Sequence, residues 1–203
     1  MINALLWDLG DVLCRFYPER RVQEIARRSG ASESDVRSLL TPELLGLLDA
    51  GDMTSGQLLT AVHDRLKWDC TIEELGAAWV VAFEPNPSIL NIARRVVVPA
   101  AVLTNNGAPL SDHFRDLLPA VAVLIPLGLF SGATRAVKPD PAAFFSACAA
   151  LNVTPSEVLL IDDSPANVAA ASRVGLQTHH FQNVELLESF MDRQHLLAPR
   201  RLR

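Results

Sequence analysis

The second half of the chain alternates short apolar runs with helical patterns, and this rhythm limits the possible folds more than any other feature of the sequence. Four apolar runs predict strands, at residues 96–103, 121–125, 158–161 and 176–181. Four segments before or between them predict helices, at residues 88–95, 110–118, 141–151 and 165–174. Because strands that alternate with helices usually form a parallel sheet covered on both faces, we expect an α/β fold with a Rossmann-like core.

An earlier apolar run, residues 3–7, predicts the first strand and ends directly at Asp8, with Gly10 two residues later. In a parallel sheet the carboxyl ends of all strands open on one edge, where α/β folds bind ligands. An aspartate in this position either takes part in chemistry or caps the helix that follows. The other segments that reach the same edge decide between these two interpretations.

The stretch between the first strand and the alternating region shows only helical patterns. Pro18 suits a first helical turn, Thr54 suits an N-cap, and T-I-E-E at residues 71–74 has the form of a capping box. Pro85 and Pro87 break the last helix of the stretch. We therefore expect an insertion of four or five helices after the first strand.

Three later polar segments should lie beside Asp8. T-N-N-G at residues 104–107 follows a predicted strand, K-P-D-P at 138–141 precedes a helix, and D-D-S-P at 162–165 follows another strand. The paired acids of the last segment would approach Asp8, and like charges about 4 Å apart repel by roughly 4 kcal/mol at an effective dielectric near 20. A divalent cation relieves this repulsion, and an all-oxygen ligand set favours Mg²⁺.

The series D-L-G-D-V, L-T-N-N, K-P-D-P-x-x-F and I-D-D-S-P-x-N, in this order, resembles the four motifs of the haloacid dehalogenase-like hydrolase superfamily. The resemblance covers nearly the whole chain, and the helical insertion resembles the small helical cap of that superfamily. The glycine two residues after the first aspartate is similar to that of bacterial phosphatases resembling α-glucose-1-phosphate phosphatase. The resemblance implies a core domain formed by residues 1–16 and 85–203, and a cap domain formed by residues 17–84.

The same resemblance implies an enzyme: a Mg²⁺-dependent phosphatase that hydrolyses a small phosphorylated metabolite of the sugar phosphate kind. Asp8 would attack phosphorus and form an aspartyl-phosphate that water later cleaves. The resemblance also implies that Asp8, the carbonyl of Gly10 and the side chain of Asp163 touch the metal. Asp162 would act mostly through water or from outside the ligand set.

Further residues of these segments would hold the phosphate and the substrate. Lys138 supplies a positive charge for the phosphate oxygens and for the nucleophile. Thr104, together with the Asn105 amide, supplies hydrogen-bond donors for a phosphate oxygen. Arg15 and Phe16, where the chain leaves the first motif, are candidate substrate contacts.

The first motif departs from the family pattern at one position. Phosphatases of this superfamily usually carry a second aspartate two residues after the nucleophile as general acid and base, whereas this chain has Gly10 there and Asp11 one residue later. A positioned acid and base typically contributes about 10²–10⁴-fold in rate. Three explanations are open: Asp11 or a cap residue takes over, the substrate needs little protonation, or the enzyme is weak. We expect a preference for good leaving groups, such as anomeric sugar phosphates or acyl phosphates.

Two other functions also stay open at this point. A haloacid dehalogenase would use Asp8 to displace halide from carbon and would also lack the second aspartate, although it has no need of adjacent acids at 162 and 163. A catalytically silent binding module would keep the fold without turnover. Halide release without Mg²⁺ would favour the first alternative, and no turnover of a broad phosphate panel would favour the second.

Composition narrows the partners and the compartment. A net charge of −5 gives no electrostatic reason to expect nucleic acid or an anionic membrane as a partner, and no run of about 18 apolar residues predicts a membrane span. Three widely spaced cysteines fit reduced thiols and a cytoplasmic location. Arg200, Arg201 and Arg203 predict a solvated basic tail. We expect a small-molecule substrate, and a monomer or a homodimer.

Overall fold

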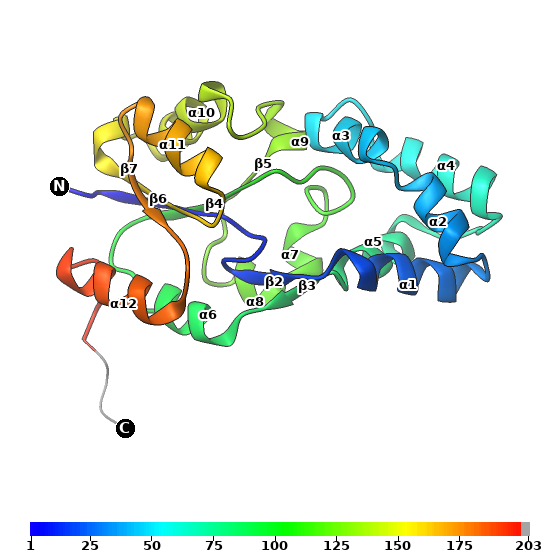
Figure 1. Ribbon diagram of the computed structural model, residues 1–203, viewed down its shortest axis with the longest axis horizontal. Coiled ribbons are helices and arrows are strands. Elements are labelled where there is room, and N and C mark those ends of the chain that lie inside the picture. Colours follow the sequence, from blue (N-terminus) through cyan, green and yellow to red (C-terminus); the bar gives the residue numbers. More distant parts are fainter. Residues whose placement is uncertain (200–203) are drawn as a thin grey trace.

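The computed structural model describes residues 1–199 and has a five-stranded parallel sheet at its centre, with the strand order β5-β4-β1-β6-β7 (Figure 1). The strands are β1 (Ala4–Trp7), β4 (Ala100–Thr104), β5 (Gly128–Phe130), β6 (Val158–Asp162) and β7 (Gln177–His180). β1 and β6 are buried along their whole length, which explains why their sequences are continuous apolar runs. The expected α/β, Rossmann-like fold is confirmed.

Helices cover both faces of this sheet. Successive residues of a strand point to opposite faces, and in β1 the side chains of Leu5 and Trp7 join one apolar core while those of Ala4 and Leu6 join a second. The first core is closed by α6 (Pro87–Ala93), α7 (Phe114–Leu117), α8 (Pro119–Ala122) and α12 (Val184–Arg193). The second is closed by α10 (Pro141–Leu151) and α11 (Pro165–Arg173), on the upper side of the sheet in Figure 1. Two short elements complete the core, α9 (Ser131–Thr134) and a 3₁₀ turn (Pro155–Glu157).

Five further helices, which we call the helical insertion, lie beyond one end of the sheet (Figure 1). They are α1 (Pro18–Ser29), α2 (Glu33–Leu39), α3 (Pro42–Ala50), α4 (Ser55–Leu66) and α5 (Ile72–Val80). Capping boxes headed by Ser32, Thr54 and Thr71 begin α2, α4 and α5. An antiparallel ribbon of β2 (Cys14–Phe16) and β3 (Phe83–Pro85) carries both connections to the sheet. The predicted domain boundaries fall at this ribbon, and we keep the division into a core and a cap domain as a proposal.

The strand predicted at residues 121–125 is wrong. Pro119 begins the short helix α8 there, and the edge strand β5 lies further along the chain. Val121 and Ile125 are almost fully buried, and a short buried apolar run looks the same in a strand and in a helical turn. The sequence also missed the β2–β3 ribbon, because strands of three residues are too short to show an alternating pattern.

Two further expectations concern a membrane span and the C-terminal tail. Within residues 1–199, no helix combines the length and the apolar character that crossing a bilayer requires. The predicted basic tail, Arg200, Arg201 and Arg203, lies outside the described residues.

Candidate active site

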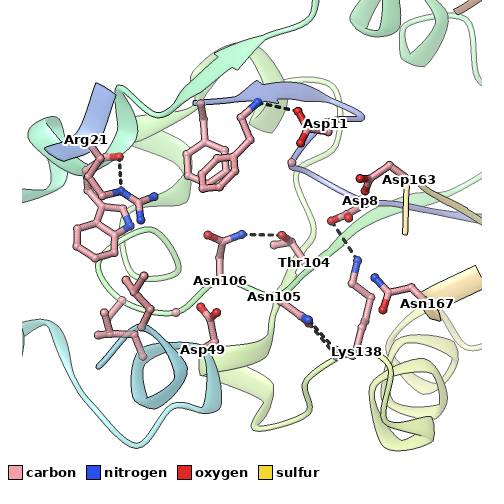
Figure 2. A pocket seen from close by; sticks show the side chains of 18 residues that line it. Asp8, Asp11, Arg21, Asp49, Thr104, Asn105, Asn106, Lys138, Asp163 and Asn167 are labelled. Carbon is pink, nitrogen blue, oxygen red and sulfur yellow. Dashed lines mark hydrogen bonds and ion pairs between the residues drawn. The ribbon is translucent and has the colours of Figure 1, made fainter. Parts of the chain in front are cut away.

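A cavity of about 340 Å³ lies at the carboxyl edge of the sheet, between the strand ends and the helical insertion (Figure 2). The sheet side of its wall is formed by Asp8, Gly10, Asp11, residues 104–108, Lys138, Asp163 and Asn167. The ribbon and the helical insertion contribute Phe16, Arg21, Leu45, Leu48, Asp49, Trp79 and Phe83. Residues from all four polar segments of the sequence therefore face one cavity.

Three aspartates converge beside this cavity, and two of them, Asp8 and Asp163, line it. Asp8 directly follows β1, and its N–H donates to the carbonyl of Ile161 at 2.9 Å, so the pairing with β6 extends to this residue. Asp162 is the last residue of β6, and Asp163 follows it. One carboxylate oxygen from each of the three aspartates lies within 4.8 Å of the other two. This spacing allows them to share one divalent cation.

Lys138 stands between two of these carboxylates. Its Nζ lies 3.0 Å from Oδ1 of Asp8, and it donates to Oδ2 of Asp162 at 2.7 Å and to the carbonyl of Leu103 at 2.8 Å. The side chain is only 1% exposed, and a cation this buried needs such partners. The Asn105 side chain fixes the Lys138 backbone, since its Nδ2 donates to the Lys138 carbonyl at 2.7 Å and its Oδ1 accepts from the Lys138 N–H at 2.8 Å.

Asp162 and Asp163 have different surroundings. Asp162 is fully buried, and its carboxylate accepts hydrogen bonds from the Ser164 N–H at 2.9 Å and from Nδ2 of Asn167 at 3.0 Å. Asp163 is partly exposed and lines the cavity, whereas Asp162 is not among the lining residues. Asp163 can therefore present its carboxylate directly to a bound ion, while Asp162 holds Lys138 and is itself held by Asn167.

Burial and neighbouring charges shift the pKa values of this cluster. Burial raises the pKa of Asp8 from 3.8 to about 6; the charge of Lys138 opposes this shift and that of Asp162 adds to it. Burial alone would lower the pKa of Lys138, but the two carboxylates outweigh it, so the pKa is raised. The pKa of Asp163 is also raised, by burial and by Asp162. A bound cation would oppose the shifts of the acids, so the donor set and its electrostatics both fit a divalent ion.

Thr104 and Gly10 complete the wall beside the aspartates. Thr104 ends β4, is buried, and accepts a hydrogen bond from Nδ2 of Asn106 at 2.8 Å through its hydroxyl oxygen. Gly10 lines the cavity two residues after Asp8. A Cβ atom at Gly10 would lie 3.7 Å from Cβ of Phe16, an ordinary contact, so lack of space does not explain the glycine.

The two candidate substrate contacts of β2 separate in the structure. Phe16 lines the cavity, and its ring lies 4.9 Å from the ring of Phe83. Arg15 is not among the lining residues; its side chain is 61% exposed and pairs with Glu84 of β3 at 3.8 Å. Because adjacent residues of a strand point to opposite faces, only one of these two side chains can face the cavity.

Asp11 braces the turn that connects β1 to the ribbon. Its φ angle of 53° is left-handed, a region in which aspartate and asparagine are enriched. Its carboxylate accepts a hydrogen bond from the Phe16 N–H at 3.0 Å (Figure 2). The carboxylate that the sequence offers as a replacement for the missing acid and base is therefore engaged in this turn.

Asn106 of the T-N-N-G segment also lines the cavity, as do Arg21 and Asp49, for which the sequence predicted no role. Arg21 lies on α1 and Asp49 on α3, and charged helical residues are usually solvated. One signal for Arg21 was present: it precedes the apolar Ile25 by four residues, which places both on the same face of a helix. Asp49 had no comparable signal.

The fold and the cavity define a class of α/β hydrolases in which an aspartate after the first strand, a buried lysine and an acidic pair meet beneath a helical insertion. Residues 2–175 match the model of the haloacid dehalogenase-like hydrolase family, and the chain belongs to this family. The resemblance that the motifs indicated is thus confirmed at the level of the superfamily.

One curated relative is similar over part of the chain. It is validoxylamine A 7'-phosphate phosphatase from Streptomyces hygroscopicus subsp. limoneus, with 33% identity over 88 residues. The match covers 43% of this chain and 41% of that protein, so the matched part of the chain spans about two-fifths of the length of this relative.

Solved structures show the same fold over most of their length. A protein from Porphyromonas gingivalis described as a predicted HAD-like family hydrolase superimposes with a TM-score of 0.75 at 24% identity, covering 96% of this chain and 98% of that one. A HAD family enzyme from Bacteroides thetaiotaomicron, in complex with magnesium and inorganic phosphate, gives a TM-score of 0.72 at 20% identity. This match covers 90% of this chain and 95% of that one. L-2-haloacid dehalogenase from Xanthobacter autotrophicus gives 0.59 at 20% identity and covers 98% and 85%.

Proposed function

We propose that this protein is a Mg²⁺-dependent phosphatase that hydrolyses a small phosphorylated metabolite, of the sugar phosphate kind, through an aspartyl-phosphate on Asp8. The observation that carries the proposal is the shared cavity in which the Asp8 carboxylate lies 3.0 Å from Nζ of Lys138 and beside Asp163. A relative named as a phosphatase and a structural neighbour that holds magnesium and phosphate support this reaction class.

The metal would be held by Asp8, Asp163 and the backbone carbonyl of Gly10, with Asp162 outside the ligand set. When bound, Mg²⁺ neutralises charge on the carboxylates and the phosphoryl oxygens. The carboxylate spacing of 4.8 Å or less supports this assignment. The raised pKa of Asp8 also supports a metal at this position, because a bound cation would favour the ionised form that attacks phosphorus.

The reaction then follows from the positions of the side chains. An oxygen of Asp8 forms a bond to phosphorus while the bond from phosphorus to the leaving oxygen breaks, which gives the aspartyl-phosphate. Water attacks the same phosphorus, releases inorganic phosphate and restores the carboxylate. Lys138 stabilises the phosphoryl charge through its own charge, because its Nζ already lies within 3.0 Å of three protein oxygens. The Thr104 hydroxyl donates to a phosphoryl oxygen.

Protonation of the leaving group is the weak step in this scheme. Gly10 offers no acid, and Asp11 uses its carboxylate to hold the Phe16 N–H. We therefore propose that substrates with good leaving groups, such as anomeric or acyl phosphates, are preferred. Rates measured over a series of phosphate esters should fall as the pKa of the leaving group rises; rates that do not depend on that pKa would overturn this preference.

A phosphate-release screen over many phosphorylated metabolites, with and without Mg²⁺, tests the proposed reaction. Wild type should release phosphate only with the metal, and Asp8→Asn should abolish release while the fold is kept. The matched control is Asp69→Asn, at an exposed acid of the chain far from the three aspartates in sequence, which should behave as wild type. Metal-independent phosphate release, or full activity of Asp8→Asn, would refute the proposal.

The alternatives have their own readouts in the same experiment. Halide release from 2-haloacids without Mg²⁺ would indicate a dehalogenase, against which the adjacent acids Asp162 and Asp163 argue. A folded protein that turns over nothing in the panel would indicate a silent binding module. The cytoplasmic location and the monomeric or homodimeric state stay predictions from the sequence.

A further inference from the structure

The end of the cavity away from Asp8 carries one buried cation, Arg21 of α1 (Figure 2). Its side chain lies over the Trp79 ring, with the guanidinium carbon 4.0 Å from the ring centroid, and its Nε donates to the Trp79 carbonyl at 3.3 Å. The residue is only 6% exposed. Within residues 1–199, its Nη2 is buried and has no hydrogen-bond partner. Because a buried charged donor without an acceptor is unfavourable, this group is arranged for an acceptor that a bound molecule supplies.

An acid from the neighbouring helix α3 faces the same end of the cavity. Asp49 is half-buried, and burial raises the pKa of its carboxyl to about 6 while the backbone of Gly107 opposes this shift. The charges of Arg21 and Asp49 influence each other, but no ion pair joins them within the described part of the chain. One donor and one acceptor therefore stand apart across the space where the leaving group of a substrate would lie.

Arg21 and Asp49 together form a subsite, and their opposite charges cancel. A second phosphate or a carboxylate would be attracted by the guanidinium and repelled by the acid, so the subsite gives a second anionic group little preference. A hydroxyl group fits better, because it can accept from a guanidinium and donate to a carboxylate. Two hydroxyls on adjacent carbons would use both side chains at once.

The remaining walls suit a compact ring. Phe16, Trp79 and Phe83 present aromatic surface, and Leu48 adds an aliphatic contact. Such surfaces pack against the C–H groups of a sugar or cyclitol ring while its hydroxyls turn to polar partners. The cavity volume of about 340 Å³ is near the lower end for ligand sites, which leaves room for one ring beside the phosphate.

We propose that Arg21 and Asp49 bind hydroxyl groups of the leaving group, so that the substrate is the monophosphate of a single polyhydroxylated ring rather than a bisphosphate or a phosphorylated acid. This inference rests on the proposed phosphatase function and deepens it. It assigns specificity to two side chains of the helical insertion, whereas the chemistry stays with the side chains at the sheet edge.

The test uses Asp49→Asn, Arg21→Lys and Arg21→Gln in the full chain with Mg²⁺. Steady-state kinetics are measured with a panel of hexose and cyclitol monophosphates, with deoxy analogues of the best of them, with a hexose bisphosphate and with acetyl phosphate. Each variant should lower kcat/KM for the best ring monophosphate roughly 10- to 100-fold, mainly through KM. Activity on acetyl phosphate, which has no hydroxyl, should be unchanged. With wild type, kcat/KM for the deoxy analogue should be lower than for its parent by a similar factor. With the variants, removal of the hydroxyl should lower kcat/KM little further.

Several outcomes would overturn the inference while the phosphatase proposal survives. These are equal losses on acetyl phosphate and on the ring monophosphate, a loss confined to kcat, a wild-type preference for the bisphosphate, or deoxy analogues that react as well as the parent. Thermal unfolding of each variant shows whether it folds; if Arg21→Gln does not, Asp49→Asn and Arg21→Lys still decide. Wild type that releases phosphate from no compound at all would instead refute the proposed function, and this inference with it.

Discussion

Replacement of Lys138 by methionine should destabilise the fold strongly and in a pH-dependent way. Nζ lies 3.0 Å from Asp8 and 2.7 Å from Asp162, so each attraction amounts to about 5–6 kcal/mol at an effective dielectric near 20. Desolvation of the three buried groups offsets much of this attraction. Removing one partner of a buried ion pair typically costs about 3–5 kcal/mol, because the other charge stays buried without compensation. We expect a loss of this size in the free energy of unfolding at neutral pH.

The direction of the pH dependence follows from Asp8. Its pKa in the folded protein is about 6 with Lys138 present, against 3.8 for the free group, and loss of the lysine removes an influence that lowers it. A carboxyl whose pKa is raised by folding binds protons more tightly in the folded state, so its contribution to stability is lost as pH rises through the folded pKa. The free energy of unfolding of the variant should therefore approach that of wild type near pH 5 and differ most above pH 7. The difference should grow by about 1.4 kcal/mol per pH unit for each proton involved.

Urea unfolding followed by circular dichroism measures this loss of stability. It is carried out near pH 5 and above pH 7, with and without Mg²⁺. Mg²⁺ should restore part of the lost stability, since it supplies positive charge to the same carboxylates. The control is Lys67→Met at the other lysine of the chain, which is exposed and should change stability little. A Lys138→Met variant whose loss is the same at both pH values, or no larger than that of the control, would refute the electrostatic argument.

Three further variants test the surroundings of the nucleophile. Gly10→Asp should fold, since a Cβ there makes only a 3.7 Å contact with Phe16. It should speed phosphate release from esters with poor leaving groups by up to about 10²-fold. A folded variant without any gain in rate would show that proton transfer is not limiting. Asp11→Asn should keep full turnover, because asparagine tolerates the left-handed φ and can accept from the Phe16 N–H; a 10²-fold loss in kcat would assign proton transfer to Asp11. Gly107→Ala should lose activity, because its Cβ would lie 1.8 Å from the Leu48 carbonyl oxygen and would force the helical insertion away from the sheet; unchanged kcat/KM would contradict this close approach.

The sequence predicted the parts of the site that directly follow strands. Asp8, Thr104 and Asp162 each stand at the carboxyl end of a buried apolar run, and parallel topology alone brings such positions to one edge. Lys138 could be included because its short motif recurs in a known family. Local sequence and topology were therefore enough for this half of the cavity.

The other half of the cavity depends on how helices pack, which short patterns do not determine. Arg20 and Arg21 are adjacent, yet Arg20 pairs with Glu84 at the surface while Arg21 is buried over Trp79. The two differ only by a rotation of about 100° around α1. Asp49 reaches the cavity because α3 packs closely against the core at Gly107, a contact that no local pattern in the sequence predicts.

Asp8 and Asp163, with the carbonyl of Gly10, are proposed to hold one divalent cation, with Asp162 close behind them. Calorimetric titration of Mg²⁺ into the protein, in the presence of inorganic phosphate, tests this central claim most directly. We expect one ion per chain for wild type, no measurable binding for Asp163→Asn and unchanged binding for Asp69→Asn. Binding to Asp163→Asn that is as tight as to wild type, or no binding to wild type, would contradict the account.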